Sequence, residues 1–305
     1  MKREGKVPHR FRSLTEIHRL LGLPEPVHPL LSLVENKGDE IDLRKFPDSF
    51  THDFYKISYK QNLSGRFKYG QGYYDFDGGG MLFKAPNQVS AGGENNNDHT
   101  GFTLLFHPDF LAGYPLAKKI RQYGFFSYSV NEALHLSEKE RSTIVSVFMN
   151  MQEELQGRLD DFSHDIIISH IETLLNYSNR FYRRQFITRK AVNNDLLQRM
   201  EEILDTYFND EQSLNRGIPT VQFLADSLSV SPGYLSDMLR SLTGQNAQQH
   251  IHNKLIEKAK EKISTTNLTI SEIAYQLGFE HPSSFTKLFK TKTNLSPVEY
   301  RQSFN

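Results

Sequence analysis

Residues 269–294, TISEIAYQLGFEHPSSFTKLFKTKTN, predict two short helices joined by a tight turn. The turn falls at Gly278-Phe279. Pro282 then begins the second helix, because a proline at the first helical position lacks only an N–H that would have no partner there. The outer face of the second helix carries small polar side chains and lysines, among them Ser283, Ser284, Lys287 and Lys290. A hydrophobic core does not require such a face, so the pattern indicates a partner outside the chain.

The same pattern occurs twice in the C-terminal third of the chain. Four apolar residues with the spacing of one helical face recur 49 residues apart. They are Val221, Leu224, Ala225 and Leu228 in the first copy and Ile270, Ile273, Ala274 and Leu277 in the second. A second stripe, Leu235, Met238 and Leu239, matches Phe285, Leu288 and Phe289. Each copy is therefore predicted to be helix, turn and helix, with one additional residue in the second turn.

This layout is typical of a helix-turn-helix, in which the first helix supports a second helix that enters the major groove of DNA. A helix predicted over residues 246–264 connects the two copies. If that helix is rigid, the two recognition helices lie in successive major grooves, about 34 Å apart. The alternative is an all-helical packing module with a solvated face. Two copies in register favour DNA.

The first half of the chain has a different pattern. Short aromatic and apolar runs separated by turn residues, between about residues 50 and 130, predict a β-sandwich or small barrel. Ser137 and Glu140 then have the spacing of a capping box, which begins a long helix. A second long helix is expected over residues 165–184. Two adjacent antiparallel helices are the simplest interpretation.

Composition excludes several classes of protein. The 305-residue chain has no cysteine, which excludes a disulfide framework, thiolate zinc sites and cysteine nucleophiles. His52, His99 and His107 are scattered, so neither a metal nor another cofactor is expected. The N-terminus has no apolar core of a signal peptide, and no run is long enough to span a bilayer. The expectation is a soluble, cytoplasmic protein with no membrane partner.

The formal net charge is zero, but the charge is unevenly distributed. Residues 178–192 hold five basic side chains and no acidic one. This segment is interpreted either as a solvated linker or as a surface that contacts DNA phosphates, where each neutralised phosphate steepens the salt dependence of binding by roughly one unit of log K per log salt.

A ligand site in the strand-rich region is predicted from residues that combine aromatic rings with polar tips. They are His52, Tyr55, Tyr59, Tyr69 and Tyr73. Such side chains suit a sugar or an aromatic metabolite held in a small barrel. The alternative is that these tyrosines are ordinary strand residues with hydroxyls in solvent.

Residues 254–301, KLIEKAKEKISTTNLTISEIAYQLGFEHPSSFTKLFKTKTNLSPVEYR, closely resemble the signature region of AraC/XylS-type transcriptional regulators. Residues 221–251, VQFLADSLSVSPGYLSDMLRSLTGQNAQQHI, look like that family's first helix-turn-helix. The strong resemblance covers residues 194–301, and a weaker one extends upstream to a cupin-like sensing domain with a helical dimerisation hairpin. The resemblance implies a homodimer that binds promoter or operator DNA, takes a small-molecule effector and contacts RNA polymerase.

Carried across by position, the resemblance also implies DNA-binding residues in both recognition helices. They are Gly233, Ser236, Asp237 and Arg240 in the first, and Pro282, Ser283, Ser284, Lys287 and Lys290 in the second. Two residues depart from the family pattern. Asp237 stands where some members have a basic residue, and its carboxylate would accept from cytosine N4 or be repelled by phosphate. Asn294 replaces the usual glycine after the second recognition helix, but asparagine tolerates the left-handed conformation.

These observations predict an α+β protein in three parts: a cupin-like effector domain over residues 1–135, a helical dimerisation hairpin and linker over 136–190, and a double helix-turn-helix over 191–305. The predicted function is sequence-specific regulation of transcription, without enzymatic activity. One alternative is a cupin-fold enzyme fused to a helix-turn-helix adaptor, which turnover or stoichiometric metal would favour. Another is a DNA-architectural protein, which binding without sequence preference would favour.

Overall fold

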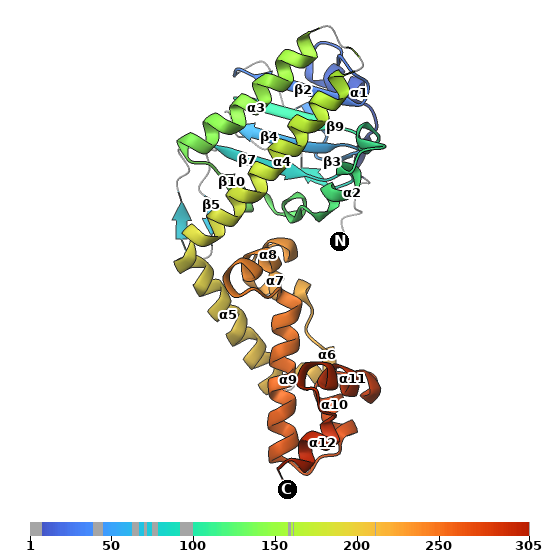
Figure 1. Ribbon diagram of the computed structural model, residues 1–305, viewed down its shortest axis with the longest axis vertical. Coiled ribbons are helices and arrows are strands. Elements are labelled where there is room, and N and C mark those ends of the chain that lie inside the picture. Colours follow the sequence, from blue (N-terminus) through green and yellow to red (C-terminus); the bar gives the residue numbers. More distant parts are fainter. Residues whose placement is uncertain are drawn as a thin grey trace, which may run out of the picture. The chain divides into compact units, whose positions relative to one another are not determined.

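The structure, a computed structural model, describes residues 8–38, 45–62, 67–69, 72–74, 79–91, 100–157, 160, 162–210 and 212–304. Its contacts divide the chain into two units, Met1–Gln185 and Phe186–Asn305, which are described separately. Strands occur in the first unit, whereas the second is helical (Figure 1). The predicted α+β class is confirmed.

The first unit is built on an antiparallel sheet of five strands in the order β10-β7-β4-β9-β2. These strands are β2 (Leu31–Asn36), β4 (Tyr55–Lys60), β7 (Gly80–Lys84), β9 (Gly101–Phe106) and β10 (Leu134–His135). Tyr59 of the central strand β4 lies opposite Met81 of β7 and Phe102 of β9. Because side chains alternate along a strand, residues 55, 57 and 59 share one face and residues 56, 58 and 60 the other.

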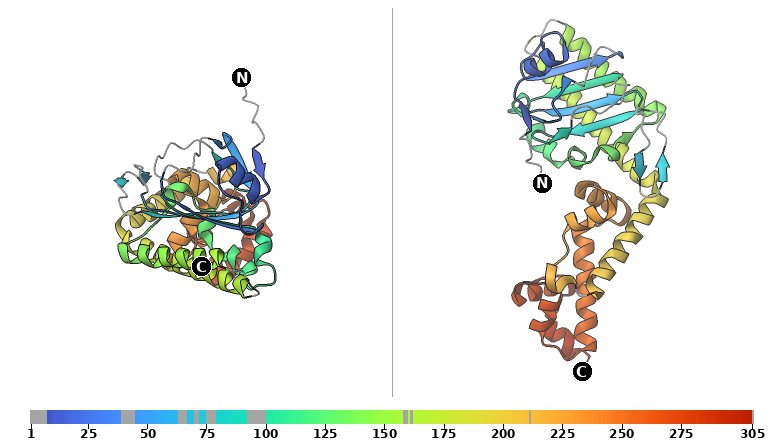
Figure 2. Two further views of the ribbon diagram at one scale, coloured as in Figure 1. Left: turned by 90° about the horizontal axis from the view of Figure 1, so that it is seen from above. Right: turned by 180° about the vertical axis from the view of Figure 1, so that it is seen from behind.

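Two long helices cover the face of the large sheet that carries Ile57 (Figures 1 and 2). They are α3 (Glu138–Gln156) and α4 (Ser163–Thr188). Phe148 of α3 stacks on Phe102 of β9, with ring centroids 5.2 Å apart. The predicted capping box is confirmed, because the Ser137 side chain accepts from the Glu140 N–H while the Glu140 side chain accepts from the Ser137 N–H.

The opposite face of the large sheet meets smaller elements. These are a second sheet of β1 (His9–Phe11), β3 (Ser49–His52) and β8 (Ser90–Ala91), and helix α1 (Leu14–Leu21). Leu105 of β9 packs there against a cluster that includes Phe11, Leu14 and Phe54. Strands β5 (Phe67–Tyr69) and β6 (Gly72–Tyr74) pair antiparallel in a separate two-stranded ribbon. The described strands thus form layered sheets, and their closure into a cupin-like barrel stays a prediction.

Short helices connect β9 to α3. They are α2 (Leu116–Lys119) and the 3-10 helices η2 (Pro108–Leu111), η3 (Ile120–Gln122), η4 (Gly124–Ser127) and η5 (Val130–Glu132). Phe125 and Phe126 of η4 pack on Phe83 of β7, with ring centroids 4.4 and 5.7 Å away. No helix in the described part of the chain combines the length and apolar character that a bilayer span requires.

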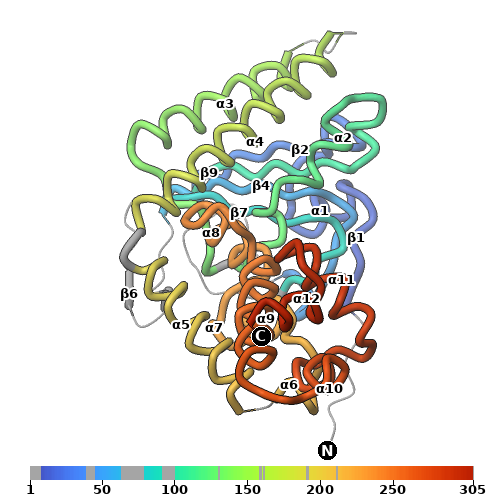
Figure 3. Tube along the Cα trace, turned by 60° about the horizontal axis from the view of Figure 1, so that its bottom comes forward, coloured from blue at the N-terminus to red at the C-terminus, as the bar shows by residue number. Residues whose placement is uncertain are grey.

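The second unit arranges its helices around one long helix, α9 (Figure 3). Its elements are α5 (Lys190–Asn209), α6 (Gln212–Arg216), α7 (Val221–Leu228), α8 (Pro232–Thr243), α9 (Ala247–Thr265), α10 (Ile270–Gln276), α11 (Pro282–Thr293) and α12 (Pro297–Gln302). Helices α7 and α8 contact α9, as do α10, α11 and α12. The predicted connecting helix is therefore continuous and carries both copies of the repeat.

Candidate nucleic-acid interface

The first helix of each repeat has well-defined ends. Thr220 accepts a hydrogen bond from the Phe223 N–H at the start of α7. Thr269 and Glu272 form a reciprocal capping box at the start of α10. The hydrogen bonds that Thr269 donates lower the pKa of the Glu272 carboxyl, because they stabilise its charged form. Local sequence therefore determines where both helices begin.

The second helix of each repeat is anchored by a narrow apolar stripe. Leu235, Met238 and Leu239 of α8 are fully buried, as are Phe285 and Phe289 of α11. The predicted stripes are confirmed for these five residues. Leu288 is half-buried instead. Tyr234, which was not part of the predicted stripe, is also fully buried in α8 and meets Phe186 edge-on, with ring centroids 5.2 Å apart.

The outer face of α11 is exposed and positively charged. Ser283, Ser284, Lys287 and Lys290 are exposed, whereas Pro282 at the first helical position is half-buried. The helix contains no acidic residue, and Lys292 adds a further exposed charge in its last turn. Lysines and short hydroxyl side chains can approach phosphates and base edges without steric conflict. This face has the chemistry of a recognition helix.

The corresponding face of α8 is different. Gly233, Ser236 and Asp237 are half-buried, and Arg240 is exposed. Arg240 Nη1 lies 2.8 Å from Asp237 Oδ1, in an ion pair one helical turn apart. The guanidinium that was predicted to contact phosphate is thus held by the carboxylate that was predicted to face the bases. The outer faces of α8 and α11 therefore carry unequal charge.

Helix α6 ties the second repeat to the chain that precedes the first. Ser213, which is 1% exposed, donates a hydrogen bond from its Oγ to the Gln276 carbonyl at 2.6 Å. Lys262 of α9 donates from Nζ to Gln276 Oε1 at 2.9 Å. Both contacts join residues distant in sequence, so no local pattern indicated them. They fix the end of α10 on two sides.

Gly278 in the second turn is pressed against the backbone after α6. Its φ is +88°, and a Cβ at this position would lie 2.5 Å from the Gly217 carbonyl carbon. That distance is far inside van der Waals contact, and only glycine has no Cβ. Backbone contact therefore holds the turn of the second repeat against the segment between α6 and α7. Gly278, which was predicted to end the first helix of the second repeat, therefore also permits the close approach of two backbone segments.

The departure at Asn294 is accommodated as predicted. Asn294 has φ +63° in the left-handed region and donates its N–H to the Lys290 carbonyl at 2.8 Å. Gly244 occupies the equivalent position after α8, with φ +77°. Asparagine is among the few residues that adopt this conformation readily.

The basic segment over residues 178–192 does not act as one surface. Arg184 is bound to Glu140, with Nη2 2.6 Å from Oε2, and donates to the His135 carbonyl at 2.7 Å. Arg180 and Arg183 are exposed. Neither a solvated linker nor a phosphate-contacting surface describes the whole segment, because Arg184 makes contacts within the first unit.

In the predicted ligand site, the structure places His52 apart from Tyr55 and Tyr59. His52 ends β3 and is 3% exposed. Tyr55 and Tyr59 share the face of β4 that α3 and α4 cover, and Tyr55 stacks on Phe106 with centroids 5.3 Å apart. Tyr69 and Tyr73 lie on the β5–β6 ribbon, and their side chains fall outside the described part of the chain. His52 and the two buried tyrosines thus do not line one site.

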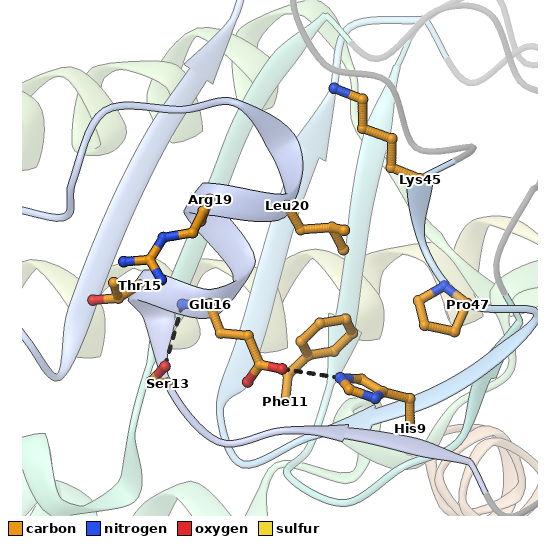
Figure 4. Close-up of a pocket in the computed structure, with 9 residues that line it drawn as sticks. All are labelled: His9, Phe11, Ser13, Thr15, Glu16, Arg19, Leu20, Lys45 and Pro47. Atoms are coloured by element: carbon orange, nitrogen blue, oxygen red, sulfur yellow. Dashed lines mark hydrogen bonds and ion pairs between the residues drawn. The ribbon is translucent and has the colours of Figure 1, made fainter.

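A hollow of about 450 Å³ lies elsewhere in the first unit, beside α1 and β1 (Figure 4). His9, Phe11, Glu16, Arg19, Leu20 and Lys45 are among its lining residues. His9 Nε2 lies 3.0 Å from Glu16 Oε1 across this hollow. The residues described as lining it include none of the five predicted ligand-site residues.

Similarity to known proteins indicates the class of the C-terminal part of this chain. A family model described as a helix-turn-helix domain matches residues 224–303. The HTH-type transcriptional activator RhaS of Escherichia coli is 24% identical over 260 residues, which cover 84% of this chain and 88% of RhaS.

The C-terminal domain of the response regulator yesN from Fusobacterium nucleatum is 33% identical and covers 35% of this chain and 98% of that domain, with a TM-score of 0.31. The C-terminal domain of AraT, a response regulator from Geobacillus stearothermophilus, is 30% identical and covers 35% of this chain and 84% of that domain, with a TM-score of 0.32.

Two helix-turn-helix motifs, joined by one helix and matched by that family model, define a DNA-binding regulator of transcription. The chain carries the matched helix-turn-helix domain over residues 224–303 and is similar over most of its length to RhaS, so the resemblance to AraC/XylS-type transcriptional regulators stated from the sequence is confirmed.

Proposed function

We propose that this regulator binds a specific operator sequence and activates transcription in response to a small molecule held by its first unit. The duplicated helix-turn-helix, with its exposed polar face on α11, is the observation that carries the proposal. The name of RhaS as a transcriptional activator supports activation rather than repression. We also propose that the protein is cytoplasmic and that it contacts RNA polymerase.

In the second recognition helix, we assign base contacts to Ser283, Ser284 and Lys287 and a phosphate contact to Lys290, with Pro282 at the start of the helix close to the DNA. A lysine can donate to the O6 and N7 acceptors of guanine in the major groove. Phosphate contacts instead position the protein and carry no sequence information directly. Lys287 and Lys290 are both exposed on α11, which makes them a matched pair for separating the two roles.

In the first recognition helix, we assign base contacts to Gly233, Ser236 and Asp237. The Asp237 carboxylate can accept from cytosine N4, which is the usual pairing for an acidic side chain in the major groove. Arg240 contacts phosphate once its ion pair with Asp237 opens. This helix therefore contributes selectivity more than affinity.

The proposal is tested by selecting binding sites from a random pool of duplexes with the full-length protein. Fluorescence anisotropy then compares the selected site with a scrambled one. Lys287→Met is expected to weaken the selected site by about 1–3 kcal/mol, roughly 5- to 150-fold, with little change on scrambled DNA. Lys290→Met is expected to weaken both sequences equally and to reduce the salt slope by about one unit.

Two results would count against the proposal. Equal loss on both sequences for Lys287→Met contradicts a base contact by this residue. A selection that enriches no sequence contradicts an operator and favours an architectural role on DNA.

The effector is proposed to act through the large sheet of the first unit. Alternate residues of β4 face opposite sides, so a ligand beside Lys56 and Ser58 lies one strand thickness from Tyr55, Ile57 and Tyr59. These three side chains face the layer of α3 and α4. A ligand that binds one arrangement of strand and helices more tightly shifts the population toward it.

A homodimer is proposed through the outer surface of α3 and the start of α4. Met149 is 49% exposed, Phe162 71% and Ile166 37%, and large exposed apolar side chains commonly mark interaction surfaces. Sedimentation velocity of the full-length protein checks this. Phe162→Glu with Ile166→Glu is expected to give a monomer, and a wild-type protein that sediments as a monomer would contradict the dimer.

A further inference from the structure

One buried tyrosine touches both the first helix-turn-helix and the segment between α6 and α7. Tyr207 of α5 is 3% exposed, and the centroid of its ring lies 5.2 Å from that of Phe223 in α7. Its hydroxyl donates to the Gly217 carbonyl, with the two oxygens 3.0 Å apart. Helix α5 also contacts α8. Tyr207 therefore connects the scaffold of the first repeat to the chain that follows α6.

The chain that follows α6 lies against the second repeat, as α6 itself does (Figure 1). Ser213 of α6 donates from Oγ to the Gln276 carbonyl at 2.6 Å, and its own carbonyl accepts from the Gly217 N–H at 3.0 Å. Gly217 in turn meets the backbone of Gly278. Ser213 and Gly217 thus close one hydrogen-bonded turn, which contacts both the end of α10 and the residue that leads toward α11.

These contacts form a connection between the two repeats that is separate from α9. It runs from α7 through Tyr207 to Gly217 and Ser213, and from them to the turn before α11. Helix α9 supports the same turn independently, because Lys262 donates from Nζ to Gln276 Oε1 at 2.9 Å. The hydroxyls of Tyr207 and Ser213 belong to buried residues, so the loss of either leaves a carbonyl without that donor.

Two recognition helices that enter successive major grooves must match the repeat of DNA. Successive major grooves are about 34 Å apart and are separated by about 10 base pairs. One inserted base pair therefore moves one half of a binding site by about 3.4 Å and rotates it by roughly 35° relative to the other half. A protein that connects its recognition helices firmly discriminates against this change, whereas a looser protein adapts to it.

We propose that Tyr207 and Ser213 are positioning residues for operator recognition. They hold α11 at a set distance and orientation from α8, so that the protein selects operators by the spacing of their two halves. This inference rests on the proposed binding of an operator. It adds a determinant of specificity that acts through the placement of a recognition helix rather than through contact with a base.

The test uses the operator selected by the full-length protein and two derivatives of it, with one base pair inserted or removed between its halves. The half that α11 reads consists of the base pairs whose substitution no longer changes the affinity of Lys287→Met. Fluorescence anisotropy measures the ratio of the Kd on altered spacing to the Kd on the selected spacing. The wild type is expected to bind the altered duplexes roughly tenfold more weakly, comparable to the effect of a mismatched base pair.

Two variants each remove one hydroxyl from the connection. Tyr207→Phe keeps the ring against Phe223, and Ser213→Ala makes the smallest change available at that residue. Each is expected to lower the spacing ratio by roughly threefold, the scale of one hydrogen bond, and the double variant should lower it further. Tyr300→Phe is the matched control, because this tyrosine of α12 packs on Phe289 of α11 and should leave the ratio at its wild-type value.

The ratio distinguishes positioning from a general loss of stability. Unfolded molecules bind none of the three duplexes, so a variant that is only destabilised binds all of them more weakly by the same factor. An unchanged ratio in the double variant overturns the proposal even if its affinity falls. Thermal unfolding shows the folded fraction of each variant.

Hydrogen exchange in the free full-length protein tests the same connection without DNA. The Phe279 N–H donates to the Ala274 carbonyl at 3.0 Å in the second turn, and the Val230 N–H donates to the Ala225 carbonyl at 3.0 Å in the first. In the double variant, exchange at Phe279 is expected to be roughly tenfold faster, with Val230 unchanged. Unchanged exchange at Phe279 would overturn the proposal.

The two measurements also separate this proposal from the proposed function. A selection that enriches no sequence contradicts operator binding, and the positioning role falls with it; faster exchange at Phe279 would then be a property of the fold alone. An enriched operator that the double variant binds with the wild-type spacing ratio removes the positioning role and leaves the proposed function standing.

Discussion

Gly278 lies where the second helix-turn-helix touches the chain that follows α6. Two features restrict which residue can occupy this position. One is the positive φ, and the other is that a Cβ would lie 2.5 Å from the Gly217 carbonyl carbon. Gly244 shares the first restriction but not the second, since its φ is +77° and no atom lies within 4 Å of the place that a Cβ would occupy. Comparing substitutions at the two glycines therefore separates the effect of backbone conformation on stability from the effect of close contact.

Gly244→Ala is expected to cost about 1–2 kcal/mol, the usual penalty for an L-residue in the left-handed region. Gly278→Ala is expected to cost more, because the backbone after α6 must also move. Urea unfolding of the full-length variants measures both changes. Equal losses for the two variants would show that the contact with Gly217 carries no energy.

His52 predicts a dependence of stability on pH. Its pKa falls from the ordinary 6.5 to about 4 on folding, so the unfolded chain holds an extra proton between these values. Stability due to this residue is therefore complete above pH 6.5 and decreases as pH falls toward 4, by at most about 3 kcal/mol. Urea unfolding at pH 7 and pH 5 measures the difference. His28, His250 and His252 also have lowered pKa values. The same two measurements on His52→Gln isolate the contribution of His52, because this variant should lose only the part of the pH dependence that is due to His52.

At the scale of elements, the unequal charge of α8 and α11 has a direct consequence. Asp237→Asn releases Arg240 from its ion pair and removes a carboxylate that repels phosphate. Non-specific affinity is expected to rise, with a salt slope steeper by about one unit. Anisotropy over a series of NaCl concentrations measures the slope. Asp226→Asn on α7, at an exposed residue, makes the same change in charge and should leave the slope nearly unaltered if the effect belongs to α8.

The two helix pairs were predictable because their signals are local. Capping residues such as Thr269, a proline at the first helical position and apolar residues at helical spacing all act within a few turns. The contact from Ser213 to Gln276 was not predictable, because it joins segments far apart in the chain. The separation of His52 from Tyr55 and Tyr59 was not predictable for a related reason. Alternation along β4 separates two faces, but it does not say which face the helices cover.

At the scale of the whole molecule, the two units have separate cores. His52 lies in the first and Gly278 in the second. Changes at distant, independent sites usually add within about 0.3–0.5 kcal/mol. Calorimetry of His52→Gln, Gly278→Ala and the double variant is expected to show additive effects in the absence of DNA and effector. A clear departure from additivity would reveal that the two cores are energetically coupled.

The repeat places a left-handed residue in each turn, but with different surroundings. Ser229 in the first turn is exposed, with φ +58°, whereas Gly278 in the second is pressed against backbone. Mutation therefore meets different restrictions in the two copies. The first turn can exchange its residue for asparagine or glycine at little cost, while the second has a single allowed residue. Descendants of this chain should consequently vary at position 229 and retain glycine at 278, so that the two halves of one duplication drift at different rates.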